Sequence, residues 1–179
     1  MAHPIKHFNT ITKHRHRVII HCAKAGIFWQ GLLHDLSKYS PTEFIAGAKF
    51  YAGQHSPNDS QRKKYGYSQA WMHHKGRNKH HFEYWTDYNP QTHRMDAVKM
   101  PLRFVIEMFC DRIAASKIYQ GKNYTDQKPL EYYMWRKEYM DIHPETLALL
   151  EKLTVMLSEK GEDETFAYIR NELRRQKDY

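Results

Sequence analysis

A chain of 179 residues is long enough to bury a full hydrophobic core and short enough to form one domain. No stretch reaches the roughly eighteen uncharged apolar residues that a membrane span needs, which excludes a membrane-spanning segment. The net charge of +8, with 13 histidines in addition, indicates an anionic partner: a nucleotide, a nucleic acid or another phosphorylated molecule. A basic surface that only keeps the protein soluble is the alternative.

Two further features bear on localisation. Residues 1–10 contain no apolar run of the kind found in signal peptides. The cysteines, Cys22 and Cys110, lie in apolar helical contexts without paired spacing, so we expect reduced thiols. Both features predict a cytoplasmic protein.

Residues 8–25 have the periodicity of an amphipathic helix. Its apolar and histidine side chains recur at steps of three and four, at Ile11, His14, Val18, His21 and Ala25. This pattern predicts that His14 and His21 share the inward face. Gly26 is expected to end the helix before a second helical run from Trp29 to Tyr39.

The second run contains the pair His34-Asp35. We expect the neighbouring apolar residues, Leu32, Leu33 and Leu36, to carry this pair toward the core. A neutral imidazole nitrogen beside an anionic carboxylate oxygen suits one divalent cation. A His-Asp dipeptide is common by chance, so the metal hypothesis depends on the histidines and aspartates elsewhere in the chain.

The segment from Ser40 to Ser68 predicts a helix followed by a loop. Ser40, Pro41 and Glu43 form a capping box for a third helix, an interpretation that we favour over a catalytic role for Glu43. Residues 52–68 are rich in turn-forming types and predict a long loop. Its basic cluster, Arg62 to Lys64, suggests a mobile cover over an anion; a solvated surface loop is the alternative.

Residues 70–85, AWMHHKGRNKHHFEYW, contain four histidines between tryptophans. If this stretch is one helix, Trp71, His74, Asn78, His81 and Trp85 form an inward stripe, and His73, Arg77, His80 and Tyr84 form the neighbouring one. Gly76 weakens this helix, and if the helix breaks there, His73 and His80 could exchange roles with His74 and His81. Hydrogen-bonded core histidines are the alternative to a binding role. Residues 87–101 predict a loop.

The stretch after Pro101 predicts a strong amphipathic helix. One face carries Phe104, Met108, Asp111, Ala115 and Ile118. An aspartate on an apolar face is costly unless it binds a metal or pairs with an arginine. Three more helices, at 129–140, 144–160 and 162–177, show apolar positions that indicate packing alone.

His14, the pair His34-Asp35 and Asp111 together resemble the pattern of the HD superfamily of metal-dependent phosphohydrolases, and Lys38 matches the lysine that often follows the pair. HDLSKYSPTEF with AWMHHKGRNKHHFEYW is also similar to a family of small bacterial and phage HD-like proteins without an assigned substrate, over most of residues 10–118. The resemblance implies an all-α protein, a single helical bundle of HD-domain type over residues 1–179. The metal-site core would span about 10–118 and the packing helices about 128–177.

The resemblance also implies the ligands. His14, His34, Asp35 and Asp111 would hold one ion, and His74 with His81 would hold a second, with Asp35 bridging. Because the interval of 20 residues from His14 to His34 is short for the superfamily, His16 and His21 are the substitutes for His14. One or two divalent ions of iron, manganese, nickel, cobalt or zinc suit such ligands, and the sequence does not select among them.

The function expected from these features is hydrolysis of a phosphomonoester or phosphodiester, with a nucleotide or nucleotide-like substrate. The expected catalytic residues are Asp35 and Lys38. The expected substrate-binding residues are His73, Lys75, Arg77, Asn78 and His80. Two alternatives from other classes stay open: a di-iron oxygenase of HD type, and a non-enzymatic module that binds nucleic acid through basic and aromatic side chains.

Overall fold

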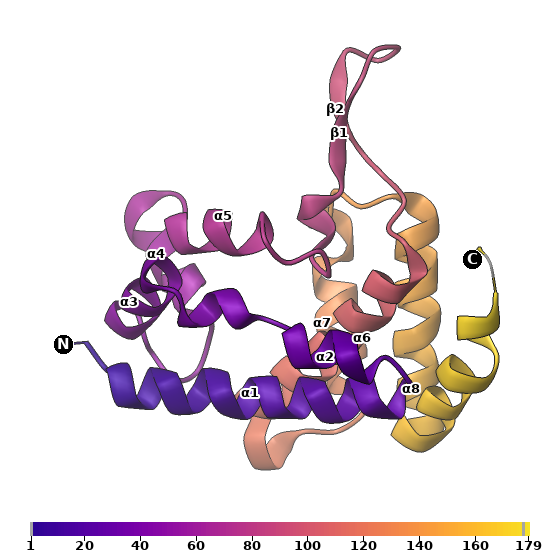
Figure 1. Ribbon diagram of the computed structural model, residues 1–179, viewed down its shortest axis with the longest axis horizontal. Helices are drawn as coiled ribbons and strands as arrows, with labels where there is room; N and C mark the ends of the chain where they lie inside the picture. The colour runs from indigo at the N-terminus through magenta and orange to yellow at the C-terminus, as the bar shows by residue number, and fades with distance from the viewer. Residues whose placement is uncertain (1, 177) are drawn as a thin grey trace.

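The structure, a computed structural model, describes residues 2–176 and 178–179 and is mostly helical, as the sequence predicts (Figure 1). The α-helices are α1 (Pro4–Lys24), α2 (Phe28–Leu33), α3 (Pro41–Lys49), α4 (Pro57–Tyr65), α5 (Gln69–Lys75), α6 (Leu102–Gln120), α7 (Lys128–Arg136) and α8 (Pro144–Asn171). Short 3₁₀ turns lie at Leu36–Tyr39, Phe82–Tyr84, Gly121–Asn123, Lys137–Tyr139 and Leu173–Arg175. A hairpin, β1 (Thr86–Asn89) and β2 (Arg94–Ala97), is the only sheet among the described residues.

The core lies where α6 meets α1, α7 and α8. Val18 of α1, Phe109 of α6, Tyr133 of α7 and Leu150 of α8 are fully buried in one cluster. Cys22 and Cys110 are free and buried in the same cluster. α6 runs through the middle of the molecule (Figure 1). Polar residues on the side of α6 that faces α1 and α2 can therefore contact those helices.

The expected helix from Trp29 to Tyr39 is wrong, because α2 ends at Leu33. Asp35 has a left-handed backbone (φ 55°), and a 3₁₀ turn follows. The Arg15 side chain of α1 donates to the carbonyl oxygens of Leu32 and His34, which satisfies the end of α2 from outside. Leu33 points to solvent instead of the core, being 70% exposed.

Leu36, at 48% exposed, also contradicts the expectation that flanking leucines carry the His-Asp pair inward. The break in the helix does this instead. His34 and Asp35 are each 1% exposed, although they sit between two outward-facing leucines. A continuous helix places neighbouring residues about 100° apart, so the left-handed residue is what turns both polar side chains inward.

The expected loop at 52–68 contains a helix, α4. The Ser56 side chain accepts a hydrogen bond from the Asn58 amide at its start, and Gly66 (φ 80°) ends it. The basic cluster therefore lies on a helix and not in a loop, and Arg62 forms an ion pair with Asp59 at 2.7 Å and lies over the ring of Trp71.

Two more expectations downstream of α4 are wrong. The stretch 70–85 is not one helix, because α5 ends at Lys75, before Gly76. Residues 87–101 are not all loop. Thr86 pairs with Ala97 and Asn89 with Arg94 in an antiparallel hairpin, which projects from the helical body (Figure 1). The Asn89 side chain closes its turn by accepting from the amide of Gln91.

The C-terminal helices match the sequence more closely. The separation expected between helices at 144–160 and 162–177 is confirmed, because α8 is kinked at Gly161, whose backbone is not helical (φ 79°, ψ 176°). α8 ends at Asn171, and residue 177, the expected end, lies outside the described residues. Among the helices described, none combines the length and apolar character needed to cross a membrane.

Gly31 allows α2 to lie directly on α1. A Cβ at this position would stand 2.6 Å from Cys22 Cβ, and both residues are buried. Gly31→Ala is therefore expected to lower the free energy of unfolding by about 1–3 kcal/mol, measured by urea denaturation. Gly76→Ala is the matched control, because Gly76 is exposed and helical (φ −73°) and its change should stay within about 0.5 kcal/mol. Equal effects of the two substitutions would contradict the close contact.

Candidate metal centre

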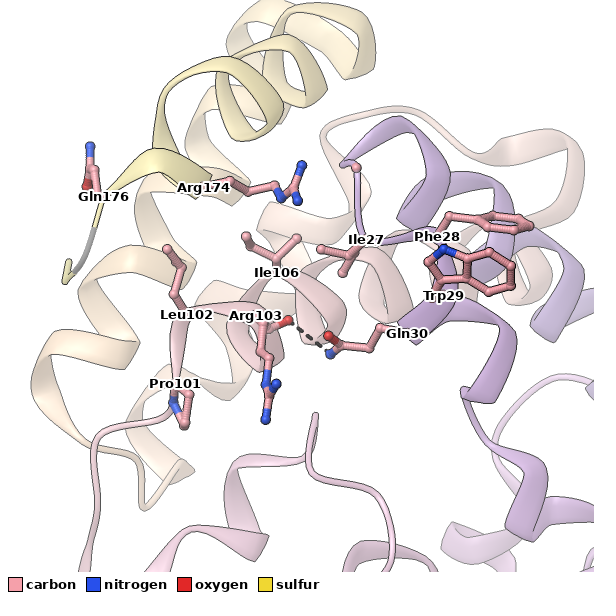
Figure 2. A pocket seen from close by; sticks show the side chains of 11 residues that line it. Ile27, Phe28, Trp29, Gln30, Pro101, Leu102, Arg103, Ile106, Arg174 and Gln176 are labelled. Carbon is pink, nitrogen blue, oxygen red and sulfur yellow. Dashed lines mark hydrogen bonds between the residues drawn. The ribbon is translucent and has the colours of Figure 1, made fainter.

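A surface pocket of about 520 Å³ lies between α2, the start of α6 and the C-terminal 3₁₀ turn (Figure 2). Ile27, Leu102 and Ile106 give it apolar walls, and Arg103 and Arg174 approach it from two sides. None of the site residues expected from the sequence lines this pocket. Those residues gather instead in the interior, around Asp35.

Asp35 presents its two carboxylate oxygens to different histidines. Oδ2 lies 3.0 Å from His34 Nε2, 3.7 Å from His14 Nε2 and 2.5 Å from Lys38 Nζ. Oδ1 lies 3.2 Å from His74 Nε2 and 3.5 Å from His80 Nε2. One buried carboxylate therefore joins two groups of nitrogen and oxygen atoms.

The first group consists of His14, His34, Asp35 and Asp111. One ligand atom from each lies within 4.8 Å of all the others. His14 comes from α1, the pair from the end of α2, and Asp111 from α6, where its Oδ1 is 2.9 Å from His14 Nε2. The structure thus brings together the four residues that the sequence suggested for a first ion.

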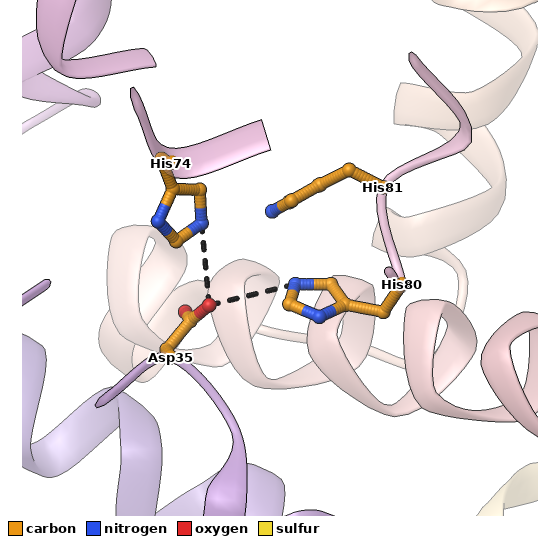
Figure 3. Close-up of side chains that lie close together, drawn as sticks. All are labelled: Asp35, His74, His80 and His81. Atoms are coloured by element: carbon orange, nitrogen blue, oxygen red, sulfur yellow. Dashed lines mark ion pairs between the residues drawn. The ribbon is translucent and has the colours of Figure 1, made fainter. Parts of the chain in front are cut away.

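The second group consists of Asp35, His74, His80 and His81, again with ligand atoms within 4.8 Å of one another (Figure 3). The helical stripe proposed for His74 and His81 does not exist, because the chain leaves α5 at Gly76. The turn after α5 nevertheless directs both His80 and His81 back toward Asp35. His80, expected to bind substrate, therefore joins His74 and His81.

Most of these atoms have no hydrogen-bond partner among the described residues. They are buried Nε2 atoms of His14, His34, His80 and His81, and both oxygens of Asp35. The Nε2 atoms of His14, His34 and His80 lie 3.7, 3.0 and 3.5 Å from Asp35 oxygens, although no hydrogen bond joins them. Buried polar atoms are almost always satisfied, and a buried set of imidazole nitrogens and carboxylate oxygens that converges in this way has the donors expected of a cation site.

The charges of the two groups are strongly coupled. Burial raises the pKa of Asp35, but His34, Lys38 and His74 lower it well below its usual range. Burial lowers the pKa of His34, yet Asp35 and Asp111 raise it well above 6.5. Buried carboxylates therefore stay ionised, and protons on histidines supply positive charge where a metal ion would supply it.

The pKa values of His14 and His81 are shifted in the opposite direction from that of His34. Burial and then Lys38 lower the pKa of His14, and burial with His80 and His74 lowers the pKa of His81 well below 6.5. Both imidazoles are therefore neutral at physiological pH. A neutral imidazole with an unprotonated Nε2 is the form that binds transition metals.

Two glutamates in the site were missed or misread at the level of sequence. Glu43 accepts from His73 Nδ1 at 2.6 Å and from His74 Nδ1 at 2.7 Å. The capping-box interpretation is wrong, because no side chain caps α3. Glu107 accepts from His34 Nδ1 at 2.9 Å and lies 3.2 Å from His80 Nδ1. The available signal was its position four residues before Asp111 in an apolar helix.

Of the other residues expected to bind substrate, Asn78 lies beside the second group, whereas Lys75 and Arg77 contact neither group within the part of the chain that the structure describes. Asn78 is buried and donates to Ser37 Oγ and to the His74 carbonyl, both at 2.8 Å, so it holds the end of α5 in place. Within residues 2–176 and 178–179, neither Lys75 nor Arg77 contacts either group by a hydrogen bond or ion pair. Arg77 is exposed and donates to the His73 carbonyl.

The two substitutes for His14 lie elsewhere. His16 is exposed on the outer face of α1. His21 is buried, with Nδ1 3.3 Å from the Cys110 carbonyl oxygen and its ring stacked on Phe166. Neither joins a group of possible ligands, whereas His14 does.

Comparison with known proteins gives one match. No curated protein and no solved structure matches the chain. A family model, described as a family of unknown function (DUF5662), matches residues 3–156. Because this range covers most of the 179 residues and includes every residue of both groups, the chain belongs to the DUF5662 family.

Proposed function

We propose that this protein is a metal-dependent phosphohydrolase with a helical domain of HD type, acting on a phosphomonoester or phosphodiester of a nucleotide or a nucleotide-like molecule. The observation that carries the proposal is the arrangement around Asp35. Each of its oxygens faces a separate group of buried ligand atoms, and neither oxygen has a hydrogen-bond partner among the described residues. Two adjacent cation sites that share one carboxylate are a recurring arrangement in phosphate ester hydrolysis.

The donor types fit divalent transition metals. His14, His34, Asp35 and Asp111 would hold one ion, and Asp35 with His74, His80 and His81 would hold the other. Imidazole with carboxylate suits iron, manganese, cobalt, nickel and zinc. Such ions, when bound, supply positive charge for phosphoryl oxygens and lower the pKa of coordinated water.

Lys38 is the residue best placed to bind the phosphate. Its side chain is 28% exposed while the neighbouring Asp35 is 1% exposed, so it lies where the buried groups approach solvent. Burial lowers the pKa of Lys38, but Asp35 and Asp111 raise it above its usual value, which keeps the ammonium charged. A charged ammonium at the rim can hold a phosphoryl oxygen and turn it toward Asp35.

The partial exposure of Asp111 indicates that a ligand would approach from the same side as Lys38. Its side chain is 17% exposed, whereas those of His34 and Asp35 are at most 1%. Lys38 and Asp111 together therefore mark the side from which a ligand reaches the interior. The net charge of +8 favours the approach of an anion to the protein as a whole.

The test uses the full chain, purified without a histidine tag or chelator. We expect up to two transition-metal ions per chain and metal-dependent phosphate release from p-nitrophenyl phosphate or from one member of a nucleotide panel. Lys38→Met should raise KM and lower kcat while leaving metal content unchanged. Oxygen-dependent turnover without phosphate release would show an oxygenase instead, and a metal-free protein that binds oligonucleotides would contradict both enzymes.

A further inference from the structure

Two buried glutamates, Glu43 and Glu107, contact the Nδ1 atoms of three candidate ligand histidines: His34, His74 and His80. An ionised carboxylate only accepts hydrogen bonds, so an imidazole nitrogen that contacts it carries the hydrogen. Glutamate is ordinarily ionised at neutral pH. Glu107 is 5% exposed, and its Oε1 lies 2.9 Å from His34 Nδ1 and 3.2 Å from His80 Nδ1. Glu43 is 6% exposed and lies 2.6 Å from His73 Nδ1 and 2.7 Å from His74 Nδ1.

The nitrogen that holds no hydrogen is then Nε2, on the opposite side of each ring. With hydrogen on Nδ1, a neutral imidazole leaves Nε2 bare. His34, His74 and His80 each turn that Nε2 toward Asp35, at 3.0, 3.2 and 3.5 Å. Outer carboxylates of this kind orient metal-binding histidines and increase their basicity.

The glutamates differ in which rings they hold. Glu107 contacts His34 of the first group and His80 of the second. Glu43 contacts His74 of the second group and His73, which belongs to neither. Glu107 therefore links the two groups, and Glu43 serves one of them.

Their surroundings also differ. Glu107 Oε2 accepts from the Gln30 side-chain amide, which also donates to the Arg103 carbonyl at 3.2 Å beside the surface pocket (Figure 2). Three N–H groups thus face Glu107: those of His34, His80 and Gln30. Two imidazoles face Glu43, and one of them, His73, is free to change tautomer without removing a ligand.

We propose that Glu43 and Glu107 are positioning residues that fix the tautomers of His34, His74 and His80, and that of the two glutamates only Glu107 affects the affinity of both ions. This inference rests on the proposed metal centre and goes beyond it, because it predicts different results for one chemical change at two positions.

Glutamine distinguishes the two positions because its side chain has one acceptor and one donor. At position 43 the amide oxygen can accept from His74 while the NH₂ group donates to His73. His34 and His80 share Oε1 of Glu107, and Gln30 contacts Oε2, so at position 107 the NH₂ group must face either both histidines or Gln30. Facing the histidines, it would move hydrogen onto their Nε2 atoms. Facing Gln30, it would force the Gln30 amide to reverse and lose its bond to the Arg103 carbonyl.

The experiment titrates the metal-free full chain with Co²⁺, followed by absorption and by competition with a chelator. Glu107→Gln should weaken both ions, by about 10–100-fold each. Glu43→Gln should weaken one ion by less and leave the other unchanged, and His73→Ala should change neither. In Zn²⁺-loaded protein, ¹⁵N spectra should show Nδ1–H on His34, His74 and His80, with the pattern altered at His34 or His80 in Glu107→Gln.

Glu107→Asp, which keeps the charge but withdraws the carboxylate, replaces Glu107→Gln if that variant does not fold, and the same loss for both ions is expected. Equal effects of the changes at positions 43 and 107, or Glu107 variants that bind Co²⁺ like the wild type, would overturn the inference and leave the proposed function intact. Two bound ions with the predicted affinities but no phosphate release would support this inference and contradict the proposed function. A wild-type chain that binds no ion would overturn both.

Discussion

Asp35→Asn should remove both metal ions together and abolish phosphate release. Asp35 is the one residue shared by the two groups, and each of its oxygens faces one of them. Asparagine keeps the shape but removes the charge, and its NH₂ group would face one of the groups with hydrogens. Since loss of an outer partner alone costs about 10–100-fold in affinity, loss of the shared ligand should exceed about 100-fold for both ions.

Asp111→Asn is the matched control for this change. It also replaces a buried carboxylate with an amide, but Asp111 belongs to the first group alone. We expect it to weaken one ion and to leave the second bound at His74, His80 and His81. Metal content measured on both variants, with circular dichroism to show that each is folded, decides the matter. An Asp35→Asn protein that still holds one ion per chain would show that Asp35 does not bridge.

The first group could be predicted from sequence because its members lie on regular helices. The steps of three and four in α1 place His14 on the face that carries Ile11 and Val18, and all three are buried. The same rule places Asp111 on the face of α6 with Met108. Helical periodicity is a local property, so it survives without knowledge of the tertiary contacts.

The placement of the His34-Asp35 pair could not be derived in the same way. The break after Leu33 depends on a left-handed residue and on Arg15, which contacts the end of α2 from another helix. Aspartate tolerates a left-handed backbone better than most residues, but nothing local requires it here. The pair points inward because of tertiary contacts, which the periodicity of the sequence does not reveal.

The second group shows a partly correct prediction made on a wrong premise. His74 and His81 were expected on one helical face, yet α5 ends at Lys75 and Gly76 is outside it. His80 and His81 reach Asp35 from a turn, where neighbouring side chains need not point apart. The inward face expected from the two tryptophans is confirmed for His74, but the tryptophans and His81 are only half-buried, and His80, expected on the neighbouring stripe, is 1% exposed.

Glu43 illustrates how one sequence pattern fits two structures. Ser40 and Glu43 have capping-box spacing, and Ser40 does precede α3. The Glu43 side chain turns away toward α5, because His73 and His74 offer two N–H donors in the interior. A hydrogen bond to the exposed end of a helix is weaker than two such bonds to a buried carboxylate, so the tertiary partners prevail.

Addition of metal should raise the melting temperature by about 10 °C. Four carboxylates, of Asp35, Glu43, Glu107 and Asp111, lie in or beside the two groups, and Lys38 is the only lysine or arginine that pairs with them in the described part of the chain. Ligand at a thousandfold excess over Kd contributes about 4 kcal/mol, and each kcal/mol shifts the melting temperature of a chain of this size by about 2–4 °C.

The rise should be larger at pH 8 than at pH 6. In the metal-free protein, burial lowers the pKa of His34 and of His74, but Asp35 raises both above the usual value, so these rings keep their protons to a higher pH than ordinary histidines do. A metal ion must displace those protons, and displacement becomes easier as the pH rises. Melting curves of metal-free and Mn²⁺-saturated protein at both pH values test this, with Asp35→Asn as the control that should not respond. If Mn²⁺ changes the wild-type curve at neither pH, histidine protons alone neutralise the carboxylates, and the two groups form a buried ion-pair network rather than a metal centre.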